Sequence, residues 1–212
     1  MNKCYLVGAG DFVLDQAPES SDLIIAADGG YDSLVKAGLK PDLIIGDMDS
    51  IKSQKTLHGV EVISFPVKKD ETDMHLGYIE GAKRGYTDFV ILGGTGGRED
   101  HTFANYSLLL YIKERGHSAI LVGRESNATV IKNEAAVFRA KIGKRISVFA
   151  FGSKAEGVFI EGLLYSASGV TLTPAFPLGV SNSFVGTDGR IHVENGALLI
   201  IFEKGVDKIS LG

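Results

Sequence analysis

The first 123 residues of the chain alternate short apolar runs with segments typical of helices, and the rest of the chain loses this alternation. The apolar runs, rich in Ile, Val and Leu, lie at Tyr5–Val7, Leu23–Ala27, Leu43–Ile45, Val60–Phe65, Phe89–Leu92 and Ala119–Val122. Runs of this length are typical of strands buried on both faces of a sheet. Between them, residues 72–86 and 100–115 carry apolar side chains at helical spacing, and residues 31–37 end on a helix-stop pattern. The alternation predicts a mainly parallel sheet with helices on both of its faces.

After Gly123 the helical periodicity disappears, and short strand-like runs follow one another. They lie at Ala128–Lys132, Arg145–Phe151, Val158–Glu161, Val170–Thr173, Arg190–Glu194 and Ala197–Glu203. Asn195-Gly196, between the last two runs, is typical of a tight hairpin turn. This half is therefore predicted to be an antiparallel β-sandwich or barrel. The expected fold class is α/β, with an α/β domain at residues 1–124 and a β-rich domain at residues 125–212.

Charge and composition exclude several classes of protein. The chain has 212 residues, 22 Lys and Arg against 26 Asp and Glu, a net charge of −4 and no strongly basic stretch, so no nucleic-acid partner is expected. The single cysteine, Cys4, excludes a cysteine-based zinc site. No segment approaches the roughly 20 apolar residues needed to cross a bilayer, and the first apolar run is too short for a signal peptide. We expect a soluble, cytoplasmic protein with no membrane partner.

Acidic residues and glycines collect directly after the predicted strands, where an open parallel sheet binds its ligands. Four strand ends carry such clusters: Asp28-Gly29-Gly30, Gly46-Asp47-Met48-Asp49-Ser50, Lys69-Asp70-Glu71-Thr72-Asp73 and Gly93–His101. Asp47 and Asp49 are two positions apart, so an extended backbone points both carboxylates to one side. Two close carboxylates repel each other unless a cation lies between them, and Mg²⁺ is a hard cation that binds both carboxylates and phosphates. The alternative is a solvated acidic turn.

The cluster that ends at Asp73 has two interpretations. Asp70 and Asp73 are spaced as the N-cap and the third residue of a helix, an arrangement that stabilises a helix start. An acid in the first turn can also reach a metal ion, so the two interpretations are compatible. Lys68 and Lys69, just before Asp70, face either an anionic phosphate or solvent.

The segment Gly93–Gly97 is the clearest candidate for a phosphate-binding loop. It contains Gly93, Gly94, Gly96 and Gly97. Glycines let backbone N–H groups approach an anion, and the next helix begins near Asp100 and adds its N-terminal dipole. Arg98 can fork onto phosphate oxygens, and His101 is either a base or a helix-capping residue. A flexible turn is the alternative. The segment does not complete a P-loop pattern, which excludes a P-loop NTPase, and Gly8–Asp11 does not complete a dinucleotide-binding pattern.

Five motifs stand together in an order that resembles one known family. They are Ala27–Gly30, Gly46–Ser50, Asp70–Asp73, Gly93–His101 with Ala104-Asn105, and Gly179–Asn182. Over nearly its whole length the chain is similar to the thiamine pyrophosphokinases, also called thiamin diphosphokinases. The resemblance implies an α/β catalytic domain, a β-rich thiamine-binding domain and a homodimer with active sites between subunits. It also implies transfer of the β,γ-pyrophosphoryl group of ATP to the hydroxyethyl oxygen of thiamine, with release of AMP.

The resemblance assigns roles to individual residues. Asp47, Asp49 and Asp73 match the acids that bind Mg²⁺, Asp28 matches an active-site acid near the phosphates, and Asp100 completes the expected catalytic set. The residues expected to contact ATP are Lys69, Thr72, Gly93, Gly94, Gly96, Gly97, Arg98 and Asn105. The residues expected to contact thiamine are Ser181, Asn182 and Phe184, the nearest aromatic ring after the Ser-Asn pair in a chain without Trp.

Two other functions fit parts of the pattern. The alternative enzyme is another magnesium-dependent nucleotide transferase or phosphohydrolase, since a pair of acids such as Asp47 and Asp49 also occurs in nucleotide-sugar glycosyltransferases. A non-catalytic sensor of thiamine or nucleotide on the same fold is disfavoured, because none of the matched acids is missing. Asp28 and Asp100 both remain candidates for the group that orients or deprotonates the alcohol.

Overall fold

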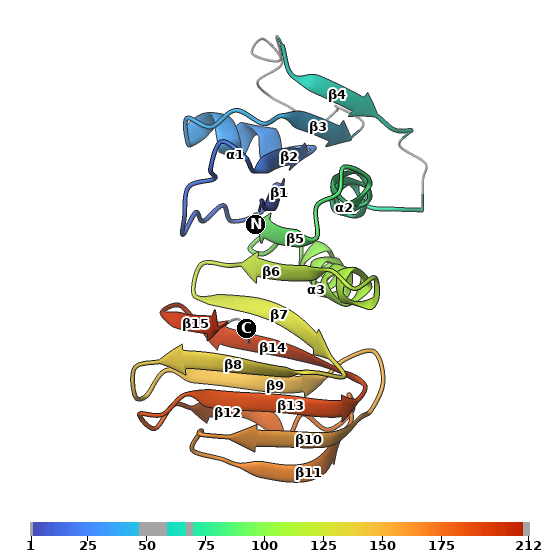
Figure 1. Cartoon of the computed structure of the whole chain (residues 1–212). Coiled ribbons are helices and arrows are strands. Elements are labelled where there is room, and N and C mark those ends of the chain that lie inside the picture. Colours follow the sequence, from blue (N-terminus) through green and yellow to red (C-terminus); the bar gives the residue numbers. More distant parts are fainter. Residues whose placement is uncertain (1, 47–58, 67–69, 210–212) are drawn as a thin grey trace. The chain divides into compact units, whose positions relative to one another are not determined.

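The computed structural model describes residues 2–46, 59–66 and 70–209 of the chain. The chain divides into two compact units, Met1–Arg124 and Glu125–Gly212. Within the described residues, the first unit combines strands with helices, and the second contains strands without helices. Figure 1 shows the elements of both units.

The first unit contains a sheet in which neighbouring strands run parallel. Its strands are β1 (Cys4–Val7), β2 (Leu23–Ala27), β3 (Leu43–Gly46), β4 (Glu61–Ser64), β5 (Asp88–Leu92) and β6 (Ser118–Val122), in the spatial order β6-β5-β1-β2-β3-β4. Its helices are α1 (Gly30–Lys36), α2 (Asp73–Lys83) and α3 (Glu99–Glu114). The strand order reverses between β1 and β5. Strands β2, β3 and β4 lie on one side of β1, whereas β5 and β6 lie on its other side.

Helices cover both faces of this sheet, with α1 on one side and α2 and α3 on the other (Figure 1). Because successive side chains of a strand point to opposite faces, β1 contributes to two cores. Tyr5 and Val7 pack in one cluster with Tyr31 of α1. On the opposite face, a Cβ atom added to Gly81 of α2 would lie 2.8 Å from the Sγ atom of Cys4, so the helix backbone packs directly on the strand. Burial raises the pKa of the Cys4 thiol well above its ordinary value of 9.0, which accords with a buried, inert thiol.

The edge strand β4 differs from the expectation for Val60–Phe65. That run is predicted to be buried on both faces, but three of the four residues of Glu61–Ser64 are exposed. Among the described strands β4 is the last in the spatial order, where it pairs with β3. Its pattern of Glu and Ser around Val and Ile suits an edge better than the interior of a sheet.

The second unit is a sandwich of two antiparallel sheets, which confirms the predicted class. One sheet holds β7 (Ser126–Lys132), β9 (Arg145–Ala150), β12 (Gly179–Ser183) and β14 (Ala197–Glu203), in the order β12-β9-β14-β7. The other holds β8 (Ala135–Ala140), β10 (Ala155–Glu161), β11 (Ala167–Leu172), β13 (Gly189–Asn195) and β15 (Val206–Ile209), in the order β11-β10-β13-β8-β15. Phe138 of one sheet and Phe202 of the other have ring centroids 5.3 Å apart, so the core lies between the sheets.

The hairpin predicted at Asn195-Gly196 is wrong. β13 pairs with β8 and β10, whereas β14 pairs with β7 and β9. The turn therefore carries the chain from one sheet to the other. Gly196 has a φ of +109°, and its N–H donates to the side chain of Asn133 at 2.8 Å. The two turn residues are suited to this corner because it needs a positive φ and a backbone hydrogen bond to a side chain.

The sequence pattern does not predict β8, β12 or β15. β12 reads Gly-Val-Ser-Asn-Ser and β15 reads Val-Asp-Lys-Ile, so neither carries an apolar run. Pairing with neighbouring strands, rather than local sequence, makes them strands.

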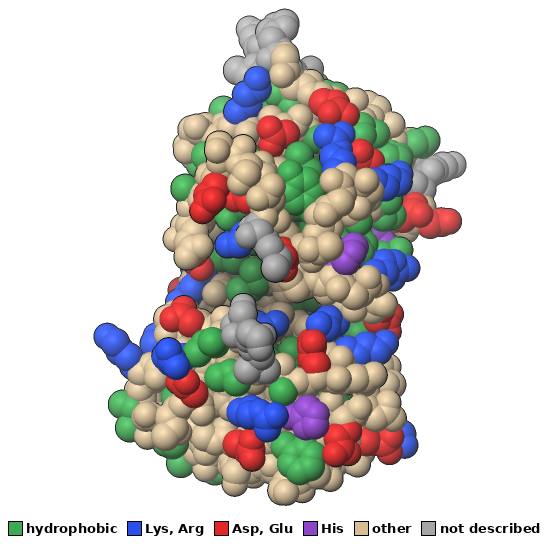
Figure 2. Space-filling view, in the orientation of Figure 1, with side chains coloured by type: hydrophobic (Ala, Val, Ile, Leu, Met, Phe, Trp, Pro, Cys, Tyr) green, Lys and Arg blue, Asp and Glu red, His purple; other side chains and the backbone are tan. Residues whose placement is uncertain are grey.

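The described helices are too short or too polar to cross a membrane. On the face drawn in Figure 2, Lys and Arg side chains are interspersed with Asp and Glu.

Candidate functional site

The loops after β1 and β5 lie side by side where the strand order reverses. The N–H groups of Gly8, Gly10 and Asp11 donate to the carbonyl oxygens of Leu92, Gly93 and Thr95, at 2.8, 2.9 and 2.7 Å respectively. These hydrogen bonds join Gly8–Asp11 to Gly93–Gly97. Ligands of open α/β sheets bind at such a reversal, outside the carboxyl ends of the strands.

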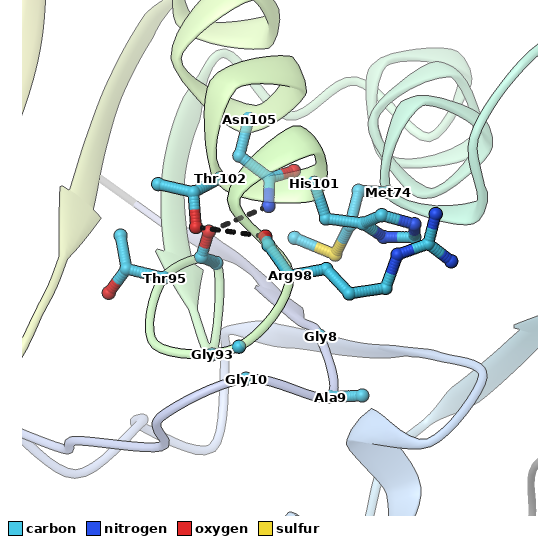
Figure 3. Close-up of a pocket in the computed structure, with 12 residues that line it drawn as sticks. Gly8, Ala9, Gly10, Met74, Gly93, Thr95, Arg98, His101, Thr102 and Asn105 are labelled. Carbon is cyan, nitrogen blue, oxygen red and sulfur yellow. Dashed lines mark hydrogen bonds between the residues drawn. The ribbon is translucent and has the colours of Figure 1, made fainter.

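A pocket of about 280 Å³ lies between the two loops and the start of α3. The loops contribute mainly backbone from Gly8–Gly10, Gly93–Thr95 and Gly97. Side chains come from Arg98, His101, Thr102 and Asn105, and from Met74 of α2. Figure 3 shows these side chains above the glycine loops. The predicted phosphate-binding loop, Arg98 and Asn105 are thus brought together, whereas the contribution of Gly8–Gly10 is missed because its motif is incomplete.

Two glycines at this pocket are required by contact between the loops. A Cβ atom on Gly10 would lie 2.7 Å from the carbonyl oxygen of Gly93 and would overlap the carbonyl oxygen of Thr95. Gly93 has a φ of +61°, and a Cβ atom there would overlap the carbonyl oxygen of Gly8. At Gly97, by contrast, a Cβ atom would meet nothing within 4 Å. The protein itself therefore needs glycine at positions 10 and 93, whereas position 97 leaves room for a side chain.

Arg98 and Asp100 form an exposed pair at the start of α3. The Nε and Nη2 atoms of Arg98 donate to the two carboxylate oxygens of Asp100, at 3.1 and 2.6 Å. The hydrogen bond from Arg98 holds the pKa of Asp100 below its ordinary value of 3.8. A carboxylate with a lowered pKa is a weak base, so this geometry disfavours Asp100 as the group that deprotonates an alcohol.

Asp28 follows β2 with a φ of +46°, in the left-handed region that non-glycine residues seldom adopt. Its N–H donates to the carbonyl oxygen of Ile45 at 2.8 Å, and one of its carboxylate oxygens is buried. A Cβ atom on Gly46 would lie 3.3 Å from the Cβ atom of Asp28. Asp28 therefore lies against the end of β3, just before Asp47. Backbone strain of this kind is concentrated at functional sites.

The predicted acids of the metal site are only partly described. Asp47, Asp49 and Lys69 lie outside the described residues. Across residues 2–46, 59–66 and 70–209, no group of three His, Cys, Asp or Glu side chains is placed to hold a metal ion. Asp73, the remaining predicted ligand, is the first residue of α2. The magnesium site therefore stays a prediction.

Thr72, not Asp70, is the N-cap of α2. Its backbone is extended, and its hydroxyl oxygen accepts a hydrogen bond from the N–H of His75 at 3.2 Å. The interpretation with Asp70 as N-cap and Asp73 as the third helical residue is therefore wrong. A threonine hydroxyl reaches the third amide of a helix well, and Asp73 then gains from the helix dipole as the first residue.

In the second unit, Ser181 lies at an irregularity in the pairing of β12 with β9. Its φ is +60°, and its N–H donates to the hydroxyl oxygen of Ser147 at 3.0 Å. It is exposed and lines a pocket of about 500 Å³ together with Ser147, Lys144 and Arg145. Bulges of this kind redirect side chains and often lie beside functional sites.

Asn182 is only 4% exposed, and its amide is committed to the backbone of two neighbours, Tyr165 and Ser183, whose N–H donates to the amide oxygen at 2.9 Å. The oxygen accepts from the N–H of Tyr165 at 2.9 Å, and the nitrogen donates to the carbonyl oxygen of Tyr165 at 2.6 Å. The side chain thus holds the backbone of Tyr165 rather than pointing to a ligand.

The stacking role expected for Phe184 is contradicted by its burial, because the ring is 1% exposed. It packs in the core, where a Cβ atom on Gly189 would lie 3.2 Å from its Cε1 atom. Tyr165, by contrast, is 65% exposed and borders an apolar pocket of about 360 Å³. The sequence analysis misses Tyr165, because nothing in the run Leu163-Leu164-Tyr165 signals an exposed ring.

The first unit matches the family model described as "Thiamin pyrophosphokinase, catalytic domain" over residues 14–121. The thiamine pyrophosphokinase of Bacillus subtilis (strain 168) is 26% identical over 187 residues, which cover 84% of this chain and 86% of that protein. Thiamine pyrophosphokinase 1 of Oryza sativa subsp. japonica is 32% identical over 112 residues, 48% of this chain and 40% of that protein.

Solved structures extend the likeness to the fold of the whole chain. The crystal structure of the Bacillus subtilis thiamine pyrophosphokinase gives a TM-score of 0.85 at 24% identity, covering 95% of this chain and 99% of that one. The thiamin pyrophosphokinase of Candida albicans gives a TM-score of 0.76 at 18% identity, covering 96% and 89%. Since the family model matches just over half of the chain, the chain belongs to the thiamin pyrophosphokinase family.

Proposed function

We propose that this chain is a thiamine diphosphokinase, which transfers the pyrophosphoryl group of ATP to thiamine and releases AMP. One observation carries the proposal: the residues that match the family's catalytic domain contain the loop and helix start that form the pocket at the strand-order reversal. Fold position, pocket and family membership therefore point to the same edge of the sheet.

The pocket suits the triphosphate of ATP. The N–H groups of Thr95 and Gly97, which line the pocket, have no acceptor among the described residues. The 16-residue helix α3 starts directly afterwards, so its dipole favours an anion at the same place. Arg98 adds a cation with a fork of donors, which exchanges its contact with Asp100 for one with a phosphate.

Asp47, Asp49 and Asp73 are the residues that would hold Mg²⁺. Their donors are all carboxylate oxygens, which is the chemistry that Mg²⁺ prefers. Asp28, which follows β2 with a strained backbone, adds a buried carboxylate oxygen on a side chain that lies against Gly46 at the end of β3. When bound, the ion neutralises charge on the phosphates during transfer.

Asp28 is our candidate for the base. It accepts the proton of the thiamine hydroxyl group as that oxygen forms a bond to the β-phosphorus of ATP. The bond from the β-phosphorus to the oxygen that bridges the α- and β-phosphates breaks, and AMP leaves. Asp100 is the weaker candidate because Arg98 lowers its pKa.

The second unit is proposed to bind thiamine through Tyr165, which borders the apolar pocket, with Ser181, which lines the pocket of about 500 Å³, as a further candidate contact. Ser181 presents a hydroxyl group from a strained, exposed position. The exposed ring of Tyr165 offers a face to the cationic thiazolium, an arrangement that cation–π attraction stabilises. Asn182 acts indirectly, since it fixes the backbone of Tyr165.

A homodimer, as the family resemblance implies, agrees with the surface of the second unit. Large apolar side chains are exposed between residues 164 and 185: Leu164, Tyr165, Phe176, Leu178, Val180 and Val185. Apolar side chains gathered in one segment favour contact with a protein surface. A cytoplasmic location also stays a prediction.

Mass spectrometry of the products tests the proposed function. The protein, thiamine, ATP and Mg²⁺ are expected to yield thiamine diphosphate and AMP in equal amounts. Formation of ADP alone would show another nucleotide transferase or phosphohydrolase. Binding of thiamine or ATP without any product would show a sensor.

A further inference from the structure

Three consecutive carbonyl groups of the glycine loop are each held by a different group. The oxygens of Gly93 and Thr95 accept from the backbone N–H groups of Gly10 and Asp11, at 2.9 and 2.7 Å. Between them, the oxygen of Gly94 accepts from the Nδ2 atom of Asn105 at 2.8 Å. Figure 3 shows this hydrogen bond from α3 to the loop. Of these three carbonyl groups, that of Gly94 accepts no hydrogen bond from the loop after β1. The side chain of Asn105 supplies its donor instead.

Because a peptide group is planar, a hydrogen bond that fixes the direction of its C=O also fixes the direction of its N–H, which belongs to the next residue. In a trans peptide the C=O and the following N–H point in opposite directions. A carbonyl of Gly94 held toward α3 therefore directs the N–H of Thr95 away from α3. The same relation directs the N–H of Gly96 away from Asp11. Within the described residues neither N–H has an acceptor, and Thr95 lines the pocket, so its N–H is available to an anion there.

The surroundings of Asn105 restrict the loop to this orientation. Asn105 is 7% exposed and lines the pocket together with Gly94. A Cβ atom on Gly94 would lie 2.9 Å from the Cγ2 atom of Ile91 and 3.4 Å from the Nδ2 atom of Asn105. The loop is packed against α3 and β5 here, and a rotated Gly94 peptide would lose its donor in a buried place.

We propose that Asn105 is a positioning residue that sets the Thr95 N–H for the phosphates of ATP before the nucleotide binds. The resemblance groups Asn105 with residues that contact ATP, whereas the structure assigns its amide nitrogen to the loop backbone. The proposal rests on the proposed function, because it takes a polyphosphate as the ligand of this pocket. It attributes part of the nucleotide affinity to a loop that is already ordered in the free protein.

The test compares Asn105→Ala and Asn105→Asp with the unchanged protein. Calorimetry measures binding of inorganic tripolyphosphate, and steady-state kinetics measure KM for ATP and for thiamine. We expect Asn105→Ala to weaken tripolyphosphate binding and raise KM for ATP about tenfold, with KM for thiamine changed less than about twofold. Asn105→Asp is expected to lose more affinity for tripolyphosphate and ATP than Asn105→Ala, because its carboxylate repels the carbonyl oxygen of Gly94.

Ser107→Ala is the matched control on the same helix. The hydroxyl of Ser107 is exposed and donates to the carbonyl oxygen of Phe103 at 3.1 Å, so its loss is expected to leave both affinities unchanged. Equal losses for ATP and thiamine, or an unchanged tripolyphosphate affinity in Asn105→Ala, would overturn the proposal. If that variant does not fold, Asn105→Ser, which keeps a hydroxyl donor, is expected to fold and to show an intermediate loss of affinity. An Asn105→Ser protein with unchanged affinity would also overturn it.

The calorimetric result separates this proposal from the proposed function. A protein that makes no thiamine diphosphate yet loses tripolyphosphate affinity in Asn105→Ala would support the positioning role and reject the enzyme activity. A protein that makes thiamine diphosphate with unchanged affinities in Asn105→Ala would support the activity and reject the positioning role.

Discussion

The two units of the chain present their candidate ligand groups in different ways. In the first unit the groups are mainly backbone N–H donors, on loops that pack so closely that Gly10 and Gly93 leave no room for a Cβ atom. In the second unit they are side chains, Ser181 and Tyr165, and a buried amide, Asn182, fixes the backbone of one of them. We therefore expect ligand binding in the first unit to be lost when a substitution adds a side chain to a closely packed loop glycine. Binding in the second unit is expected to weaken when a substitution removes a side chain.

The chemistry of the two substrates explains this difference. Phosphate oxygens accept hydrogen bonds from any well-placed N–H, so backbone supplies many donors with no loss of side-chain entropy. An aromatic cation such as thiamine is recognised by a ring face and a few polar side chains, which backbone cannot supply. The comparison predicts that variants of the first unit mainly change KM for ATP, whereas variants of the second unit mainly change KM for thiamine.

Gly93→Ala is expected to have the largest effect. Its φ of +61° costs an alanine about 1–2 kcal/mol, and overlap with the Gly8 carbonyl adds about 1–3 kcal/mol. Chemical denaturation is expected to show a loss of about 4 kcal/mol of unfolding free energy, with loss of ATP binding. Gly97→Ala, which meets open space, should keep the stability of the unchanged protein. Equal stability of the two variants would contradict the account of loop packing.

Phe184→Ala and Tyr165→Ala form the next pair. Removal of the buried ring of Phe184 is expected to cost about 3 kcal/mol of unfolding free energy, because a cavity remains in the core. Removal of the exposed ring of Tyr165 is expected to change stability by less than about 0.5 kcal/mol and to raise KM for thiamine about fivefold. An unchanged KM for thiamine in Tyr165→Ala would remove this residue from the proposed thiamine site.

Asn182→Ala is expected to show a smaller loss of stability, of about 2 kcal/mol, because the peptide groups of Tyr165 lose their partners. Asn182→Asp keeps the acceptor for the Tyr165 N–H and should therefore lose less unfolding free energy than Asn182→Ala. Both should raise KM for thiamine and leave KM for ATP unchanged in steady-state assays. A matching rise of KM for ATP would show that Asn182 acts on the whole protein rather than on Tyr165.

The smallest expected effect is the titration of Asp100. Arg98 lowers its pKa, so the pair stabilises the fold at pH values above the ordinary value of 3.8 and loses that contribution as pH falls through the lowered pKa. Both side chains are exposed, which keeps the contribution small. NMR titration of the Asp100 carboxyl is expected to show a midpoint below 3.8, and Arg98→Ala should raise it. A midpoint that Arg98→Ala does not move would contradict the pairing.

The sequence predicts the fold class well because the sheet of the first unit is buried and periodic. The runs at Leu23–Ala27 and Ala197–Glu203 coincide with β2 and β14. Strands such as β12 are missed because their polar residues become extended only by pairing with a neighbour. The corner at Gly196 is mistaken for a hairpin, since the same turn residues suit both.

The candidate site is predictable where chemistry follows a strand end, as at Asp28 and Gly93–Gly97. It is not predictable where distant residues meet. Asn182 fixes Tyr165, 17 positions earlier, so proximity in sequence points wrongly to Phe184. In the same way, Asn105 reaches the carbonyl of Gly94, 11 positions earlier, across the first turns of α3.

The most direct test of the central claim follows one labelled phosphorus atom. ATP labelled with ³²P at the β-phosphate is incubated with thiamine, Mg²⁺ and the protein, and the products are separated. Transfer of a pyrophosphoryl group breaks the bond on the α side of the β-phosphorus, so we expect the label in thiamine diphosphate and none in AMP. Label recovered in ADP, with a thiamine product that carries none, would contradict the account.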